Sequence, residues 1–375
     1  MKYRFKRIVK PFIFSILWVH SYLFSWTRYL FSKRDSVDNI IYKLKMEKLN
    51  KFSETVAIVA IFQKKLCSNF HQVLSDLNKK NIPCFVFNNE HLDQQDILKI
   101  LPLTTVYHEC KYQAGKDFGC YQLGVKLINY LIEKEGLSFS RVVFINDSIM
   151  ILPSRFPQFL EEFLSYTDDW VGITETTQIH YHVSSWFFSV SKRIWGEVAF
   201  QKFWESYKPL SPRRYVIRKG EVLLSQTLIR IGYAPRVMFA SSRFFSALMQ
   251  QRPEQWLDFI RFLPIAVMSE LFPEHIQLSL INSGKLIVDY IYSKLLSSQS
   301  DTNLTHFWQC LGILHADFVF VKKDIYYRGV YSLSQIREVA SRLPEFEQLV
   351  EKIIAKPDPR TFSLYKRAQH TFHFI

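Results

Sequence analysis

Short apolar runs alternate with helical periodicity in the first half of the chain. Residues 55–62 (TVAIVAIF), 83–87 (PCFVF) and 141–145 (RVVFI) are rich in β-branched and aromatic side chains, which predicts buried strands. Between these runs, residues 68–80 and 121–132 carry apolar side chains at helical spacing. The resulting β-α-β-α-β order predicts an α/β fold of Rossmann type, in which helices flank both faces of a mostly parallel sheet.

The second half of the chain changes gradually from strands to helices. Residues 169–174 (DWVGIT) and 186–191 (WFFSVS) are further strand candidates, and apolar spacing predicts a helix over 221–231. From residue 251 the pattern is mainly helical, with predicted pieces near 254–272, 275–297, 304–314 and 333–354. We therefore expect three parts, which are an N-terminal segment over 1–52, an α/β domain over 53–250 and a helical region over 251–375.

The N-terminal segment combines aromatic side chains with a high positive charge. Residues 1–52 hold twelve Lys or Arg and three acidic residues, so they carry +9 of the chain's net charge of +14. Within them, residues 11–31 read PFIFSILWVHSYLFSWTRYLF. No small-residue cleavage site follows this stretch, which disfavours a signal peptide.

Three arrangements of residues 11–31 stay open. A membrane-spanning helix has the right length, but His20 and Arg28 dilute its apolar character. A helix packed on the protein's own body is the second arrangement. We favour an amphipathic helix on an anionic membrane surface, because Trp18 and Trp26 suit the headgroup layer and the basic residues attract anionic lipid.

The composition limits the partners that the chain is expected to bind and the cellular compartment in which it is expected to work. Outside residues 1–52 the chain carries only +5, so we expect no nucleic-acid partner. The five cysteines show neither paired spacing nor a zinc-binding pattern, which is typical of a protein in a reducing compartment. An apolar content of 48%, with 33 Phe and 19 Tyr, supplies the material for a large core.

The strongest candidate for chemistry follows the most apolar strand. Asn146, Asp147 and Ser148 come directly after the run at 141–145, and parallel α/β sheets bind ligands beyond the carboxyl ends of their strands. The Asp147 carboxylate can hold Mg²⁺ or Mn²⁺ and so offset the charge of a departing diphosphate. Asn146 and Ser148 can add hydrogen bonds. An ordinary Asn-Asp-Ser turn explains the same residues equally well.

A glycine-rich segment at 115–124 (GKDFGCYQLG) is the second candidate. Asp117 falls near a predicted helix start, where we expect it to act as an N-cap. Gly115 and Gly119 permit close approach of the backbone to a ligand, and Lys116 can meet a phosphate. A capped helix without any ligand is the alternative for each of these residues.

Two further motifs add ionisable side chains. In residues 179–188 (IHYHVSSWFF), His180 and His182 alternate, so a strand would point both toward one face. They can bind a metal, face a sugar, or form a solvated strand edge. Glu221 opens the helix predicted at 221–231, where a carboxylate can take a proton from an attacking hydroxyl or simply stabilise the helix dipole.

A last polar cluster lies late in the chain. Its members fall within NLTHFWQCLG and FVFVKKDIY, and they are Asn303, Thr305, His306, Lys322 and Lys323. The basic residues can close over a diphosphate, whereas a pair of surface lysines is the default interpretation.

Taken in order, these motifs resemble the rhamnan synthesis protein F family of glycosyltransferases. The matching segments are Gly-Lys-Asp-Phe-Gly-x-Tyr at 115–121, Asn-Asp-Ser at 146–148, Trp-x-Gly-x-Thr at 170–174, His-x-x-Ser-aromatic-Phe at 182–187, Glu221 before a Leu-Ser helix, Asn-x-Thr-His at 303–306 and Phe-x-x-Lys at 320–323. The resemblance extends over residues 55–330, which is most of the chain.

The resemblance implies a GT-A-type fold over 53–250, with the region 251–375 completing the active site. It implies inverting transfer of rhamnose or another hexose from a nucleotide-diphosphate donor to a lipid-linked or cell-surface polysaccharide. It places Glu221 as the catalytic base and Asp147 as the ligand of a divalent cation, Mg²⁺ or Mn²⁺. The donor would be bound by Gly115, Lys116, Asp117, Tyr121, Asn146, Asp147, Ser148, His182, Ser185, His306 and Lys323.

A role in bacterial surface glycans such as lipopolysaccharide O-antigen implies a place on the cytoplasmic face of the inner membrane. The basic segment 1–52 would then attach the protein peripherally to anionic lipid. A non-catalytic, membrane-associated scaffold of a polysaccharide assembly complex is the alternative, since a single carboxylate at 146–148 makes a weaker metal site than a pair.

Overall fold

The computed structural model describes residues 2–32, 35–41, 43–44, 53–111, 115–177, 179–250, 260–265, 305, 308–323, 325–326 and 329–354. Of the helix predicted over 254–272, only residues 260–265 belong to this part of the chain. The helix predicted over 275–297 lies outside the described residues.

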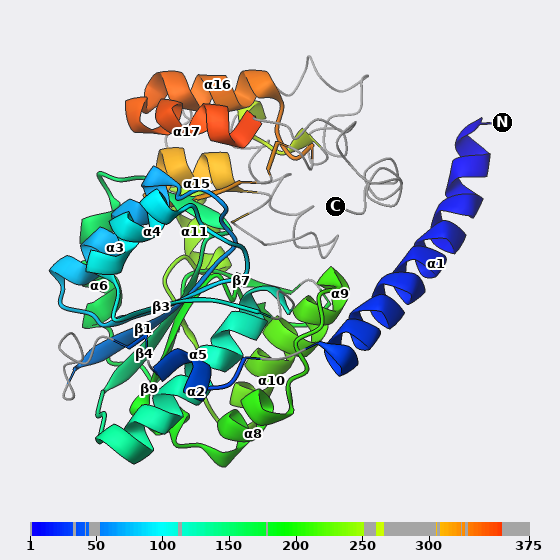
Figure 1. The fold of residues 1–375 in the computed structure, drawn as a ribbon. Coiled ribbons are helices and arrows are strands. Elements are labelled where there is room, and N and C mark those ends of the chain that lie inside the picture. The colour runs from blue at the N-terminus through cyan, green and yellow to red at the C-terminus, as the bar shows by residue number, and fades with distance from the viewer. Residues whose placement is uncertain are drawn as a thin grey trace.

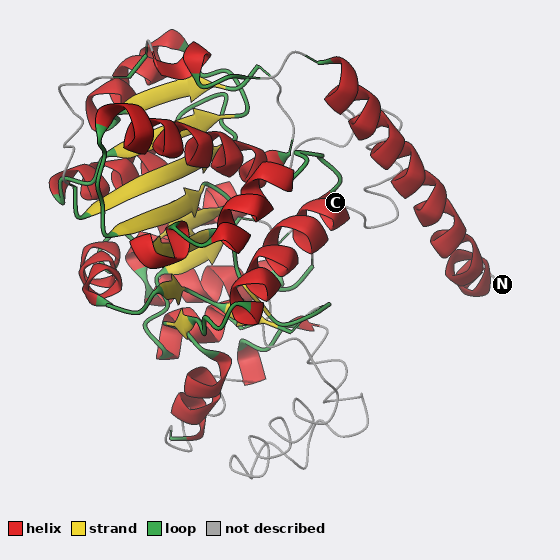
Figure 2. Ribbon diagram, turned by 90° about the horizontal axis from the view of Figure 1, so that it is seen from below, coloured by secondary structure: helices red, strands yellow, loops and turns green. Residues whose placement is uncertain are grey.

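A seven-stranded sheet forms the centre of the molecule (Figure 2). Its strands are β1 (Thr55–Ile61), β2 (Cys84–Asn88), β3 (Val106–Glu109), β4 (Arg141–Asn146), β6 (Trp170–Gly172), β9 (Phe187–Ser191) and β10 (Arg236–Val237). Their order is β10-β6-β9-β4-β1-β2-β3. All neighbours pair in parallel except β9, which runs antiparallel between β4 and β6. The predicted mostly parallel, Rossmann-like fold is therefore confirmed.

Alternating side chains in β1 explain how the sheet receives a helical layer on each face. Ala57 and Val59 point into one core, whereas Val56 and Ile58 point into the other. Burial on both faces is the reason that the strand reads as a continuous apolar run. The first core is covered by α3 (Ser68–Lys79), α4 (Gln94–Ile100), α6 (Phe156–Ser165), α15 (Gln309–His315), α16 (Leu333–Arg342) and α17 (Pro344–Ile354) (Figure 1). The second is covered by α2 (Asp38–Ile41), α5 (Lys116–Glu135), α7 (Lys192–Trp195), α8 (Val198–Ser206) and α10 (Leu223–Arg230).

Aromatic rings fix α5 to the sheet. Phe144 of β4 stacks on Phe188 with ring centres 4.6 Å apart, and on Trp204 of α8 at 5.8 Å. From α5, Phe118 stacks on Trp204 at 5.7 Å, and Tyr121 meets Phe144 edge-on at 5.2 Å. Such pairs contribute about 0.5–1.5 kcal/mol each beyond the area they bury. The first turn of α5 is thus held in a fixed position relative to the end of β4.

The C-terminal part joins the α/β domain through a small antiparallel sheet. Its two strands are β5 (Ile149–Ile151) and β11 (Phe320–Lys322), and they pair so that Lys322 lies opposite Ile149. Because β5 begins directly after the turn at 146–148, this register brings Lys322 beside that turn. The predicted helix over 333–354 is present as the pair α16 and α17.

The predicted helix over 221–231 has an unusual beginning. A three-residue helix, α9 (Arg213–Tyr215), runs into a π-helix, η3 (Val216–Val222), which continues as α10. The remaining described elements are the antiparallel pair β7 (Glu175–Thr176) and β8 (His182–Val183), the short 3-10 helix η2 (Leu101–Leu103), and α11 (Ser241–Met249).

The N-terminal helix α1 (Lys2–Phe31) projects from the body, with its C-terminal end beside α9 (Figure 1). At that end, the Ser25 hydroxyl accepts a hydrogen bond from the Ser211 amide at 2.9 Å, and Lys208 Nζ lies 4.6 Å from the Trp26 ring centre. In the same C-terminal half of the helix, large apolar side chains such as Phe24 and Phe31 are exposed. Within the described ranges, no helix combines the length and the apolar character needed to cross a membrane.

Candidate functional site

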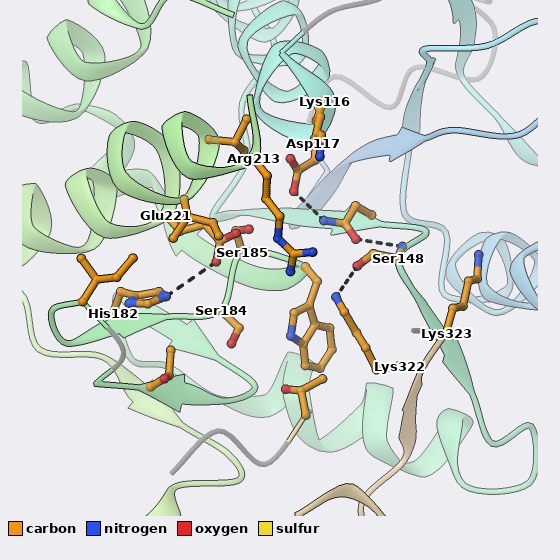
Figure 3. A pocket seen from close by; sticks show the side chains of 17 residues that line it. Lys116, Asp117, Ser148, His182, Ser184, Ser185, Arg213, Glu221, Lys322 and Lys323 are labelled. Carbon is orange, nitrogen blue, oxygen red and sulfur yellow. Dashed lines mark hydrogen bonds and ion pairs between the residues drawn. The ribbon is translucent and has the colours of Figure 1, made fainter. Parts of the chain in front are cut away.

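A cavity of about 420 Å³ opens at the carboxyl end of β4, between β8, η3 and the start of α5 (Figure 3). This volume lies within the range of small-molecule sites. Its walls are formed by Lys116, Asp117, Asn146, Ser148, Thr176, Ile179, His182, Ser184, Ser185, Trp186, Arg213, Val216, Ile217, Glu221, Thr305, Lys322 and Lys323. Segments that are far apart in the sequence therefore meet at the strand end where the fold predicts a ligand.

Asn146 connects the two motifs that the sequence singled out. Its side-chain amide donates to Asp117 Oδ2 at 2.8 Å, and its Oδ1 accepts from the Ser148 amide at 3.0 Å. Its own backbone amide donates to the Trp186 carbonyl at 2.9 Å. The turn at 146–148 is thus an Asx-type turn whose remaining amide group holds the Asp117 carboxylate at the cavity wall.

Asp147 is buried behind this wall, and its side chain is not among those that line the cavity. Its Oδ2 accepts a hydrogen bond from Gln63 Nε2 at 2.8 Å and lies 3.9 Å from Lys323 Nζ. Lys323 Nζ also donates to the Asp147 carbonyl. The carboxylate predicted to hold a metal ion is therefore engaged by an amide and an ammonium group.

The predicted Mg²⁺ or Mn²⁺ does not fit this set of donors. A divalent cation in a transferase site needs at least one carboxylate that faces the substrate phosphates, whereas Asp147 faces Gln63 and Lys323. Among the described residues, no three His, Cys, Asp or Glu side chains lie close enough to share a metal ion. The cavity wall presents four basic side chains, from Lys116, Arg213, Lys322 and Lys323, beside the carboxyl groups of Asp117 and Glu221.

Asp117 lies in the first turn of α5, but it is not the N-cap. That position belongs to Gly115, whose φ of 77° is left-handed, and the N-cap prediction for Asp117 is wrong because the helix begins earlier than expected. Gly115 also packs closely on Pro209, since a Cβ at Gly115 would lie 2.4 Å from the Pro209 Cβ. Burial, together with the charge of Glu221, raises the pKa of Asp117 to about 6.

Glu221 reaches the opposite side of the cavity from the π-helix η3. Its side chain is 23% exposed, toward the cavity, and the rest is enclosed by protein. Burial raises its pKa, while the charges of Lys322 and Arg213 and a hydrogen bond from Ser185 act in the opposite direction. A carboxylate with a raised pKa binds a proton more tightly than an exposed glutamate does. Groups with pKa values shifted in this way are frequent among catalytic residues.

His182 is buried next to Glu221. Its Nε2 lies 3.7 Å from Glu221 Oε2, and its Nδ1 contacts the His180 carbonyl at 2.8 Å. Because a carbonyl can only accept, Nδ1 carries a proton and Nε2 faces the carboxyl group. His180 itself is exposed and precedes β8, so the prediction that both histidines share one face is wrong.

Lys322 and Lys323 arrive from the C-terminal part of the chain. Lys322 Nζ donates to Ser148 Oγ at 3.0 Å, and the opposing wall contributes Arg213 from α9. Figure 3 shows the Arg213 and Lys322 side chains directed into the cavity, whereas Lys323 lines its edge and turns its ammonium group toward Asp147. The lysine pair that the sequence places late in the chain therefore lines the cavity.

The structure sorts the remaining predicted site residues into three groups. Eight of them line the cavity, and these are Lys116, Asp117, Asn146, Ser148, His182, Ser185, Glu221 and Lys323. Three lie behind its wall: Gly115, Asp147, and Tyr121, whose hydroxyl donates to the Ser185 carbonyl at 3.0 Å. His306 lies outside the described residues.

Sequence reasoning missed several residues of the site, among them Gln63 and Arg213. Gln63 follows β1 just as Asp147 follows β4, so the rule about strand ends should have found it. Arg213 carries no such signal, because it precedes a helix and only tertiary packing brings it to the cavity.

Fold and site together define an α/β protein with a charged, small-molecule cavity at the carboxyl edge of its sheet. The family model for rhamnan synthesis protein F matches residues 84–274, which is half of the chain, and the protein belongs to this family. The family name connects it with synthesis of rhamnan, a polysaccharide. A comparison with curated proteins finds no match.

Proposed function

We propose that the protein is a GT-A-type glycosyltransferase. It moves a sugar, rhamnose or another hexose, from a nucleotide-diphosphate donor to a lipid-linked or cell-surface polysaccharide, with inversion. One observation carries this proposal: a buried carboxyl group, Glu221, and a set of basic side chains that includes Lys322 and Arg213 line the same cavity. Transfer from a nucleotide sugar needs this pair of features, a base for the acceptor and positive charge for the leaving group.

In the proposed chemical step, each wall of the cavity has a separate role. The acceptor hydroxyl oxygen attacks the anomeric carbon from the side of Glu221, and its proton passes to the Glu221 carboxylate. The bond between the anomeric carbon and the diphosphate oxygen breaks, and the electron pair leaves with the diphosphate. The raised pKa of Glu221 supports this role, because a base is most effective when its pKa approaches the working pH.

Residues around Glu221 would orient the donor and the base. His182 and Ser185 hold the Glu221 carboxyl group, and Asp117, fixed by Asn146, lies where the resemblance places the nucleotide. Lys116, Ser148 and Lys323 would contribute donors to the phosphates. Residues behind the wall, such as Tyr121, position these groups without touching the donor.

We further propose that α1 lies on an anionic membrane surface at the cytoplasmic face. Exposed apolar side chains along α1 suit the headgroup layer, and the charge of +9 in residues 1–52 complements anionic lipid. Sedimentation of the full chain with vesicles of phosphatidylcholine, with and without phosphatidylglycerol, tests this. We expect binding only to the anionic vesicles and release at high salt. Binding independent of phosphatidylglycerol, or none at all, would exclude this surface.

The transferase proposal is tested by incubating the full chain with a panel of nucleotide sugars and measuring nucleotide release. The same panel is titrated by calorimetry. At least one donor should bind and release its nucleotide, and the release should increase when membrane glycolipid is added. If no nucleotide sugar binds or turns over, the transferase proposal fails and the scaffold alternative is favoured.

A further inference from the structure

We propose that the donor diphosphate is neutralised by side-chain cations alone, without a divalent metal ion. This inference rests on the proposed function and names how the same cavity recognises its donor. Lys322, Lys323 and Arg213 are the residues that would contact the diphosphate, with Lys116 at the edge of the cavity. Asp147 would act as a positioning residue for Lys323 and not as a metal ligand.

The contacts of Asp147 are the first support. Its carboxylate accepts from Gln63, which is itself held because Gln63 Oε1 accepts from the Cys67 amide at 2.8 Å. Its other partner is Lys323, bound through both the carboxylate and the carbonyl of Asp147. A metal ion at this carboxylate would have to displace Lys323 or Gln63, and the present contacts hold Lys323 in place at the cavity wall.

The placement of the cations is the second support. Lys322 is fixed at the end of β11 by the pairing with β5, and its ammonium group contacts Ser148. Arg213 enters from the far wall on α9 (Figure 3). Arginine suits phosphate oxygens because its guanidinium group presents several donors in one plane. Two walls therefore offer cations to one central volume.

The charge balance is the third support. Four basic residues line the cavity, namely Lys116, Arg213, Lys322 and Lys323, and two carboxyl groups, Asp117 and Glu221, oppose them. With both carboxyl groups ionised, the wall carries a net charge of +2, and the Asp147 carboxylate beside Lys323 lowers the local total to +1. The site is therefore positively charged without a metal ion, as the binding of an anionic nucleoside diphosphate sugar requires. A bound Mg²⁺ would raise this total to +3 and would be repelled by the basic side chains that line the same cavity.

This arrangement also serves the reaction. As the bond between the anomeric carbon and the diphosphate breaks, the electron pair moves onto the β-phosphate and adds one negative charge there. Cations already in place stabilise that charge without any rearrangement. The acceptor proton leaves in the opposite direction, to Glu221, so no further reactant is needed.

Calorimetry in EDTA tests the inference, with inorganic pyrophosphate and with UDP, GDP, dTDP and ADP as probes. We expect binding in EDTA, with a dissociation constant that changes less than threefold when MgCl₂ or MnCl₂ replaces the chelator. Lys322→Gln and Arg213→Gln should each weaken binding by about tenfold or more. Arg214→Gln is the matched control, because Arg214 lies on the same short helix and is not among the cavity-lining residues. It should bind the probes like the unchanged chain.

Nucleotide release completes the test. Turnover that survives EDTA, together with the losses in Lys322→Gln and Arg213→Gln, supports side-chain neutralisation. Binding or turnover that requires Mg²⁺ or Mn²⁺ overturns it and leaves the transferase proposal intact. Equal losses in Arg214→Gln would also overturn it, since the effect would then follow total charge. Absence of turnover for every donor with and without metal refutes the transferase proposal itself.

Discussion

A single methyl group added at Gly220 should lower both the stability of the fold and the activity of the site. Gly220 directly precedes Glu221 in η3, and a Cβ built there would lie 2.8 Å from Phe118 Cδ2. Phe118 is fully buried and stacks on Trp204, so its ring cannot move aside cheaply. Gly220→Ala should therefore push η3 away from the first turn of α5, which carries Asp117.

The size of the effect follows from two opposing contributions. Overpacking a close-packed core by one carbon costs about 1–3 kcal/mol, whereas replacing a helical glycine by alanine gains up to about 1 kcal/mol. Gly196→Ala is the control, because Gly196 has an ordinary φ of −73° and its Cβ would meet nothing nearer than 3.6 Å. The control should gain about 0.4–1 kcal/mol.

The two variants should thus differ by about 1–3 kcal/mol in the free energy of unfolding. Urea unfolding followed by tryptophan fluorescence measures this difference, and the melting temperatures should differ by about 1–4 °C. Gly220→Ala should also lower the transfer rate, because Glu221 moves with η3. Adding Phe118→Leu should recover part of the stability, a coupling that a double-mutant cycle detects. If Gly220→Ala is as stable as Gly196→Ala, the close contact does not constrain η3 and the reasoning is refuted.

Two further predictions concern the carboxyl groups of the cavity. Glu221→Gln should lower the transfer rate about 10²–10⁴-fold at saturating donor. Glu205→Gln, on the exposed face of α8, is the control and should keep the rate of the unchanged chain. A decrease of less than threefold in Glu221→Gln would exclude this residue as the base. Asp117→Asn should remove a pH dependence of stability. The pKa of Asp117 is about 6 in the folded protein and about 3.9 when unfolded, so the folded state binds the proton more tightly and stability should fall as pH rises from about 4 to 6. Melting temperatures between pH 4 and 7 should show this fall in the unchanged chain and a smaller one in Asp117→Asn, and parallel curves would contradict it.

The strands of the sheet could be predicted because burial on both faces leaves a continuous apolar signal, as in β1 and β4. β3 could not, because its sequence is Val-Tyr-His-Glu. There, His108 is buried, and its Nε2 lies 2.7 Å from Oδ1 of Asp35, which is 73 residues away. A polar strand that depends on such a distant partner leaves no local pattern.

The candidate site was predictable as far as local rules extend. The position of Asn146 at a strand end identified the correct edge of the sheet, yet the rule does not state where a side chain points. Asp147, next in sequence, turns toward Gln63 because Asn146 already occupies the side that faces Asp117. The contact between Lys322 and Ser148 joins residues 174 positions apart, so it depends on the pairing of β5 with β11.

The junction between α1 and the body has a practical consequence for any study of this protein. Lys208 and Ser211, which hold Trp26 and Ser25 of α1, belong to the same stretch of chain as Arg213. The proposed lipid anchor, α1, and the proposed donor-binding residue Arg213 are thus connected through one short segment of chain. A shortened chain that begins after α1, chosen for easier handling, would release this segment, and its donor affinity would then underestimate that of the intact protein.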